Sequence, residues 1–255
     1  LQTDSATCRA KSVPLFDKDR DYEDIQSRFF DADRDGDMDL YVVSGGTEMK
    51  EDLPIYQDRL YINDGRGNFT KNISALPKIR SSGSCVVTWD YDGDGDIDIF
   101  RGGRTIPDKY PYPPKSYLLL NDGKGNYSDA TDALAPELRQ IGMVTDAAWL
   151  DLNGDNFPEL IVVGEWMPIV VFENDKGKLA KAESSKYGVQ QTEGWWNRIA
   201  KGDVDGDGDI DLIAGNLGTN YKFHASKEKP FMVYCDDYDK NGTYDVVLAK
   251  YDGKD

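Results

Sequence analysis

A nine-residue pattern rich in aspartate recurs five times along the chain. Each copy offers side-chain oxygens at positions 1, 3, 5 and 9, and position 6 is Gly or Asn, which suits the left-handed backbone of a tight loop. Positions 1, 3, 5, 7 and 9 are occupied by Asp31, Asp33, Asp35, Asp37 and Asp39; by Asp90, Asp92, Asp94, Asp96 and Asp98; by Asp151, Asn153, Asp155, Phe157 and Glu159; by Asp203, Asp205, Asp207, Asp209 and Asp211; and by Asp237, Asp239, Asn241, Thr243 and Asp245. Carboxylates this close together repel one another unless a cation neutralises them. The pattern therefore predicts metal-binding loops.

The chemistry of these loops indicates calcium, with up to five ions in the chain. Calcium binds six to eight oxygens at about 2.3–2.6 Å, which alternating side chains and the backbone carbonyl of position 7 can supply. Magnesium is less suited, because it keeps several waters and requires a stricter octahedron. Asn153 and Glu159 in the third loop, and Asn241 and Thr243 in the fifth, replace aspartates, so weaker binding is expected there. The alternative, solvated turns without metal, fits five regular copies poorly.

An EF-hand loop opens in the same way but needs a bidentate glutamate at position 12 and a helix on each side. In the five loops position 12 is Val42, Arg101, Val162, Ala214 and Leu248, none of which binds metal through its side chain. The residues that follow the loops form short β-branched or aromatic runs, which are typical of strands. Strands are therefore expected around the loops.

A second feature, an Asn-Asp-Gly turn, follows two of the loops at residues 63–65 and 121–123, with a weaker echo at residues 174–177. Such a turn between apolar runs is a hairpin signal. Each unit is therefore expected to run strand, calcium loop, strand, long connection, strand, hairpin, strand, over about 50–60 residues, as a propeller blade does. The predicted fold is all-β: a β-propeller, or a sector of one, made of four-stranded antiparallel blades.

The blades are expected to form a single repeat domain over residues 1–255. The approximate units are 26–84, 85–145, 146–198, 199–232 and an incomplete 233–255. Asp203 and Asp237 are only 34 residues apart, too few for a full blade. Either this blade lacks strands or the chain is a sector of a larger ring, and the second explanation is favoured. The chain begins at Leu1 and ends just after a strand-like run, so it is expected to be a fragment of a longer chain. Helical periodicity is scarce, and residues 134–140 are its best candidate.

The charge balance excludes one large class of function. The chain has 47 acidic and 30 basic residues and a net charge of −17, a field that repels nucleic acid. The three cysteines, Cys8, Cys85 and Cys235, are an odd number without CxxC spacing, so a disulfide framework is not expected. His224 is the only histidine, which argues against zinc. No run reaches the length of a membrane span, so membrane insertion of this segment is not expected.

From about Phe29 onward the chain resembles the FG-GAP or VCBS repeat propellers, which include the integrin α-subunit heads. It is most similar to large bacterial surface proteins with an ASPIC/UnbV-type region, and to cartilage acidic protein. The resemblance rests on DLYVVSGG (39–46), DRLYIN (58–63), GGRTIP (102–107), GMVTD (142–146), GEWMP (164–168), GWWN (194–197) and GNLGTN (215–220). It implies a β-propeller with calcium in its loops, exported to the extracellular space, the cell surface or the periplasm. It supplies no catalytic residues.

No catalytic residues are predicted from the chain's own chemistry either. Glu165 beside Trp166 is the best acid outside the loops, but a strand residue packed at a blade edge is the favoured explanation. His224 lies in a loop-like stretch, and the chain has no Gly-x-Ser-x-Gly elbow.

The long connections are rich in aromatic residues and prolines, which suit partner binding because aromatics give large contact areas at low entropic cost. Candidate ligand-binding residues are Tyr110, Tyr112, Trp195, Trp196 and Tyr221. Packing between blades is the competing explanation, above all for the two tryptophans.

Three functions follow from these features. The first is a non-catalytic, calcium-stabilised module for extracellular or cell-surface binding or adhesion to a protein or carbohydrate ligand. The second is the scaffold of a carbohydrate-active enzyme, which predicts a deep pocket near the ring axis with a buried pair of acids. The third is a structural spacer with no ligand, in a large surface protein. The sequence favours the first and third over the second.

Overall fold

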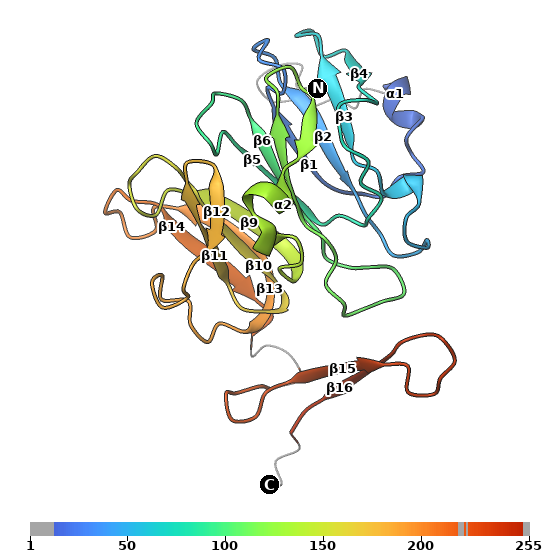
Figure 1. Cartoon of the computed structure of the whole chain (residues 1–255), viewed down its shortest axis with the longest axis vertical. Helices are drawn as coiled ribbons and strands as arrows, with labels where there is room; N and C mark the ends of the chain where they lie inside the picture. The colour runs from blue at the N-terminus through green and yellow to red at the C-terminus, as the bar shows by residue number, and fades with distance from the viewer. Residues whose placement is uncertain (1–12, 219–221, 223, 252–255) are drawn as a thin grey trace, which may run out of the picture.

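The computed structural model describes residues 13–218, 222 and 224–251, and β-strands dominate this part of the chain (Figure 1). The first unit contains β1 (Asp24–Phe30), β2 (Asp39–Ser44), β3 (Arg59–Asn63) and β4 (Phe69–Lys71). The second unit contains β5 (Cys85–Trp89), β6 (Asp98–Gly102), β7 (Tyr117–Asn121) and β8 (Tyr127–Asp129). The third unit contains β9 (Met143–Leu150), β10 (Glu159–Met167), β11 (Val170–Asp175) and β12 (Lys178–Lys181). Two hairpins follow, β13 (Gly194–Gly202) with β14 (Asp211–Asn216), and β15 (Met232–Asp236) with β16 (Asp245–Ala249).

Each of the three units is an antiparallel sheet in which strands adjacent in sequence pair with one another. The predicted all-β fold of four-stranded antiparallel sheets is confirmed, as are the hairpins that join β3 to β4, β7 to β8 and β11 to β12. The third sheet also includes β13 and β14, because Trp195 pairs with Glu165 and Gly194 with Met167 at the end of β10.

Helices occupy little of the described chain. They are α1 (Pro14–Asp17), α2 (Thr131–Leu134) and the 3-10 turns η1 (Pro54–Tyr56) and η2 (Pro136–Leu138). The expected helical stretch at 134–140 is interrupted at Ala135, because a residue that precedes proline is disfavoured in the helical region. No helix in the described ranges has the length and apolar character needed to span a membrane.

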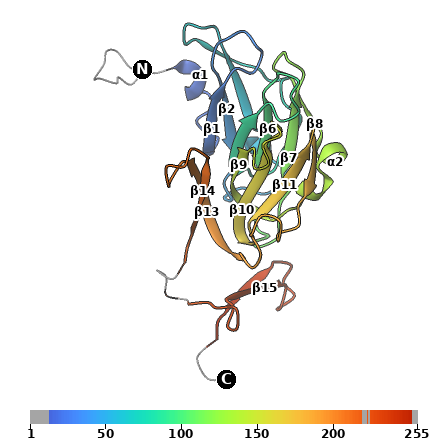
Figure 2. The same cartoon turned by 90° about the vertical axis from the view of Figure 1, so that its left-hand side faces the viewer.

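The three sheets lie side by side through their first strands, with β1 against β5 and β5 against β9 (Figures 1 and 2). One hydrophobic cluster fills the space between the first and second sheets, and another fills the space between the second and third. Successive residues of the second sheet go to opposite clusters, as in the pairs Val86 and Val87, Ile99 and Phe100, and Leu118 and Leu119. The second sheet is therefore buried on both faces.

The connections between strands divide into two edges. The metal-loop edge contains the aspartate loops, between the first and second strands of each unit, and the hairpin turns, between the third and fourth. The opposite edge contains the connection from second to third strand (residues 45–58 and 103–116) and the connections between units (residues 72–84, 130–142 and 182–193). Within each sheet, antiparallel order dictates this separation, because consecutive strands reverse direction.

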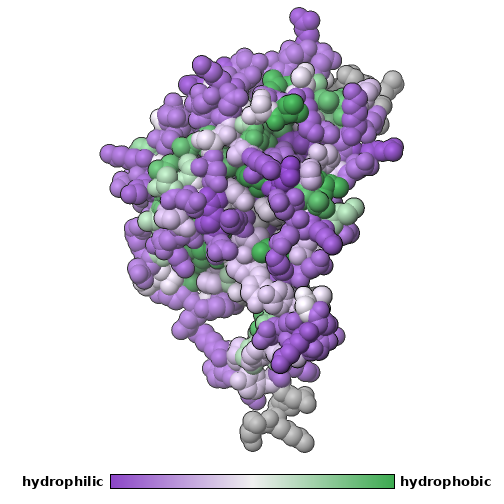
Figure 3. Space-filling view, turned by 45° about the vertical axis from the view of Figure 1, so that its right-hand side comes forward, coloured by the Kyte–Doolittle hydropathy of each residue, from purple (hydrophilic) through white to green (hydrophobic). Residues whose placement is uncertain are grey.

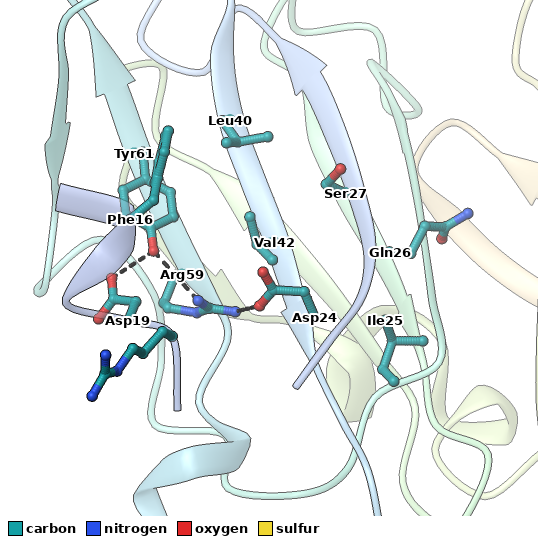
Figure 4. Close-up of a pocket in the computed structure, with 11 residues that line it drawn as sticks. Phe16, Asp19, Asp24, Ile25, Gln26, Ser27, Leu40, Val42, Arg59 and Tyr61 are labelled. Atoms are coloured by element: carbon teal, nitrogen blue, oxygen red, sulfur yellow. Dashed lines mark hydrogen bonds and ion pairs between the residues drawn. The ribbon is translucent and has the colours of Figure 1, made fainter. Parts of the chain in front are cut away.

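The outward face of the first sheet is only partly covered. Phe16 of α1 packs on Tyr61 and Phe69, with ring centroids 5.1 and 5.8 Å apart, while Ile25 and Phe29 of β1 stay exposed. Beside α1 lies a cavity of about 410 Å³, in which Arg59 lies between Asp24 and Tyr61 (Figure 4).

The surface is hydrophilic over most of the face in Figure 3, with apolar residues in small groups. The hairpin β15–β16 lies away from the three sheets in Figures 1 and 2, and Val246, Val247 and Leu248 on it are exposed.

A buried ion pair joins the first and second units. The guanidinium of Arg101 on β6 is fully buried and donates from Nε to Asp58 Oδ2 at 3.0 Å. The Asp58 carboxylate also accepts the Tyr41 hydroxyl at 2.7 Å and the Ser44 backbone N–H at 2.9 Å. Arg101 makes its remaining hydrogen bonds to Ser81, so both charges are fully partnered inside the interface.

Replacing one partner leaves the other charge buried and unpaired. We expect Arg101→Met to lower the free energy of unfolding by about 3–5 kcal/mol, measured by urea denaturation. Lys109→Met, which breaks the exposed and solvent-screened Lys109–Glu51 pair, should leave it nearly unchanged. Equal, small effects of the two substitutions would show that the buried pair does not hold the units together.

Candidate metal centre

The five aspartate loops share one conformation, set by the carboxylate at position 1. It accepts the backbone N–H of position 6 in every loop at 2.9–3.2 Å. In three loops it also accepts the N–H of position 4: Gly93 on Asp90, Gly154 on Asp151 and Gly206 on Asp203. These bonds curl the backbone around the carboxylate.

The glycines at position 6 have the left-handed backbone that the sequence predicts, and Asn156 in the third loop shares it with a φ of 70°. Position 4 is left-handed as well, which the sequence reasoning did not foresee. Glycine fills this position in three loops, but in the other two it is Arg34 (φ 66°) and Lys240 (φ 60°). Residues other than glycine seldom adopt this backbone region, so the conformation of Arg34 and Lys240 costs free energy that the rest of the loop offsets.

The carboxylate at position 9 closes each loop by accepting the backbone N–H of position 2 or of a nearby strand. Asp39 is fully buried and accepts Ala32 N–H at 2.9 Å and Asn63 N–H at 2.8 Å. Asp98 Oδ1 accepts Asn121 N–H at 2.9 Å, and Glu159 accepts Leu152 N–H at 2.8 Å. Position 9 therefore fixes the loop to the sheet while keeping a carboxylate at its base.

Four of the loops bring three carboxylates together, with one oxygen from each lying within 4.8 Å of the others. The triads are Asp31, Asp33 and Asp39; Asp90, Asp92 and Asp94; Asp203, Asp205 and Asp211; and Asp237, Asp239 and Asp245. All these residues are among the predicted metal ligands. Within the described ranges the third loop forms no such acidic triad, and there the Asn153 amide donates to Glu159 Oε1 at 3.0 Å.

Several oxygens in the first two loops are buried without any hydrogen-bond partner: Asp31 Oδ1, Asp33 Oδ1 and Asp98 Oδ2. Burial, together with the charges of Asp92 and Asp94, raises the pKa of Asp98 to about 8. Burial first and a neighbouring aspartate second also raise the pKa of Asp33 and of Asp92. A buried carboxylate oxygen with no donor is costly unless a cation lies against it. These all-oxygen donor sets therefore fit calcium.

The structure also reveals loop residues that the sequence reasoning missed. The asparagine that opens each hairpin turn contacts an aspartate loop: Asn63 donates to Met38 O at 3.1 Å, Asn121 to Ile97 O at 3.1 Å and Asn174 to Pro158 O at 3.0 Å. The sequence shows an asparagine at the same place in all three turns, but the general preference of asparagine for turns explains this recurrence equally well.

Of the five aromatic candidates, Tyr110 and Tyr112 lie in a connection of the opposite edge, and Trp195 and Trp196 lie at the start of β13, where the chain leaves that edge. Tyr221 lies outside the described residues. The hydroxyl of Tyr110 accepts the indole N–H of Trp166 at 2.6 Å, and Trp195 packs on Trp166 with ring centroids 5.1 Å apart. Tyr112 lies apart, against Tyr244 at 5.0 Å. Trp196 donates to Thr192 O at 2.8 Å and does not join the group. The structure thus brings Tyr110 and Trp195 together around Trp166.

A cavity of about 390 Å³ on the opposite edge is lined by residues of all three units and of β13. Among them is Arg104, whose Nε donates to the buried carboxylate of Glu165 at 2.9 Å. Glu165 therefore has a cationic partner, and Glu23 and Glu48 at the cavity are exposed. His224 is exposed too.

A comparison with solved structures finds a similarity between this chain and a fungal lectin. It comes from Agrocybe aegerita and is described as recognising non-reducing terminal N-acetylglucosamine specifically. The two chains share 17% sequence identity with a TM-score of 0.45, over 74% of this chain and 46% of the lectin chain, so this chain spans less than half of the lectin's length. No curated protein sequence matches the chain.

Residues 31–101 and 151–214 match the FG-GAP-like repeat family. Together they make up more than half of the chain, and they contain the first four aspartate loops. The chain belongs to the FG-GAP-like repeat family.

Proposed function

We propose that this protein is a non-catalytic, calcium-binding repeat module of the β-propeller type that binds a protein or carbohydrate partner outside the cell. The observation that carries the proposal is the set of buried, unpartnered oxygens in the aspartate loops. Calcium would be held by the side chains at positions 1, 3, 5 and 9 with the backbone carbonyl of position 7. Its charge would offset the repulsion among these carboxylates.

The arrangement of the sheets supports the propeller architecture. Blades of a propeller are four-stranded antiparallel sheets placed radially, with their first strands nearest the axis. In this chain β1, β5, β9 and β13 lie next to one another in that order. The exposed apolar residues on the outer faces of the first sheet and of β14, such as Phe29 and Ile213, fit a sector with room for further blades.

The calcium supply supports the proposed location outside the cytoplasm. A loop with a dissociation constant of about 0.1 mM contributes about 1.4 kcal/mol to stability at about 1 mM extracellular calcium. The same loop stays empty where free calcium is far lower. Several such loops together match the whole stability of a typical domain.

The opposite edge is the proposed binding surface. Tyr110, Trp166 and Trp195 form an aromatic group beside the cavity, and Arg104 and Arg198 line the cavity itself. Rigid aromatic side chains beside a concave surface are typical of binding sites. The ion pair of Arg104 with Glu165 supports binding over catalysis, because a neutralised carboxylate next to a cation is poorly placed to act as a general acid.

Calcium removal should destabilise the protein. We expect excess EGTA to lower the melting temperature by at least about 5 °C and calcium to restore it, with magnesium less effective. Mass spectrometry under native conditions should find several calcium ions per chain, and one fewer in Asp90→Ala. Asp21→Ala, which removes a highly exposed acid outside the loops, is the control for net charge. No bound calcium and no thermal shift would reduce the loops to solvated turns.

Removing an aromatic side chain from the opposite edge should weaken partner binding. We expect Trp195→Ala to lower affinity for a ligand found on a glycan array or a panel of extracellular proteins by about tenfold or more. Trp89→Ala is the matched control, because Trp89 is half exposed but ends β5 at the metal-loop edge. Equal losses in the two variants would place the partner elsewhere. An array and panel without any ligand would favour a structural spacer.

A further inference from the structure

The hairpin asparagines of the second and third units contact two aspartate loops at once. Asn121 donates not only to its own loop but also to Ala32 O of the first loop, at 2.8 Å. Asn174 in the same way donates to Tyr91 O of the second loop, at 2.7 Å. Both asparagines are buried, and Ala32 and Tyr91 occupy position 2, between the metal ligands at positions 1 and 3. Asn63, in the first unit, contacts only its own loop among the described residues.

The glycines of these turns allow the turn of one unit to pack closely against a metal ligand in the loop of the preceding unit. A Cβ added at Gly125 of the second unit would lie 3.4 Å from the Cβ of Asp33 in the first loop. One added at Gly177 of the third unit would lie 2.6 Å from the Cβ of Asp92 in the second loop, a distance that only glycine permits. Position 3 of each of these loops therefore rests on the hairpin turn of the next unit.

Neighbouring loops also touch each other directly, from position 4 of one to position 7 of the next. Arg34 of the first loop donates from Nη1 to Asp96 Oδ1 of the second, at 2.7 Å. The corresponding contact between the second and third loops is Gly93 against Phe157, whose ring would lie 3.3 Å from a Cβ at Gly93. The same geometry thus recurs at two interfaces with different side chains.

We infer that the first three loops form a coupled row, in which Asn121 and Asn174 position the ligands of two loops each, so that calcium binding at one loop strengthens binding at the next. The inference rests on the calcium function proposed above. A ligand that orders one loop also orders the asparagine and turn that support its neighbour. Coupling between two binding sites is reciprocal, so the effect acts in both directions along the row.

The fourth loop differs from this row. Asp203 and Asp205 are exposed, and in the described part of the chain this loop makes hydrogen bonds only within itself. A Cβ at Gly206 or Gly208 would meet nothing within 4 Å. The chain therefore contains a coupled row and at least one loop that binds independently.

Calcium titration against a competing chelator, on the whole chain, tests the coupling. In the wild type, we expect positive cooperativity among the sites of the row. Asn121→Ala should lower it by uncoupling the first loop from the second, and should weaken these two sites by about fivefold or more each, whereas Asn63→Ala, which disrupts the same kind of turn, should weaken only one. Native mass spectrometry should show partly loaded species at higher abundance in Asn121→Ala than in the wild type.

A second pair of variants keeps the test decisive if Asn121→Ala fails to fold. Arg34→Ala breaks the other contact between the first two loops from the surface, and Arg66→Ala removes an exposed arginine from a hairpin turn. Reduced cooperativity in Arg34→Ala alone supports the coupling. Identical titrations of Arg34→Ala and Arg66→Ala, or equal effects of Asn121→Ala and Asn63→Ala, overturn it while leaving calcium binding intact. A wild type that binds no calcium removes the coupling and the proposed function together.

Discussion

The second sheet has almost no face in contact with water, and the positions of the other elements depend on this burial. Its strands send alternate side chains into two separate hydrophobic clusters, one shared with the first sheet and one with the third. Burial of apolar surface on both faces aligns three sheets through their first strands. That alignment in turn puts all the aspartate loops of these units on one edge and the long connections on the other.

Acidic residues are concentrated on the metal-loop edge because the backbone N–H groups of each loop donate to carboxylates. Aspartates that accept backbone N–H groups in or beside the loops also leave oxygens buried and unpartnered, as Asp31 and Asp98 do. The chain therefore concentrates its acidic residues where a bound cation would offset the cost, and the Arg101–Asp58 pair holds the interface behind them. On the opposite edge, Arg104 and Glu165 neutralise each other beside the aromatic group.

Much of this arrangement could be predicted from the sequence, because it rests on local rules. The spacing of Asp90 to Asp98, a following apolar run and an Asn-Asp-Gly turn specify loop, strand and hairpin without knowledge of distant contacts. The left-handed backbone of Arg34 could not be predicted, since arginine seldom adopts that conformation, and its ion pair with Asp96 joins residues 62 positions apart. Nor could the meeting of Tyr110 with Trp166, 56 residues away, because register between units is set by packing. Asn121 was recognised as a turn residue, but its bond to Ala32 spans 89 residues.

The contacts of Gly177 with Asp92, and of Asn121 with Ala32, have a consequence for how such chains evolve. A repeat whose loop is completed by the following repeat is not an interchangeable module. Inserting, deleting or shuffling one unit changes the turn that meets the preceding loop, so two sites are altered by one genetic event. Neighbouring repeats would then be inherited as pairs, and a transplanted unit would need the turn of its original successor to keep its own loop intact.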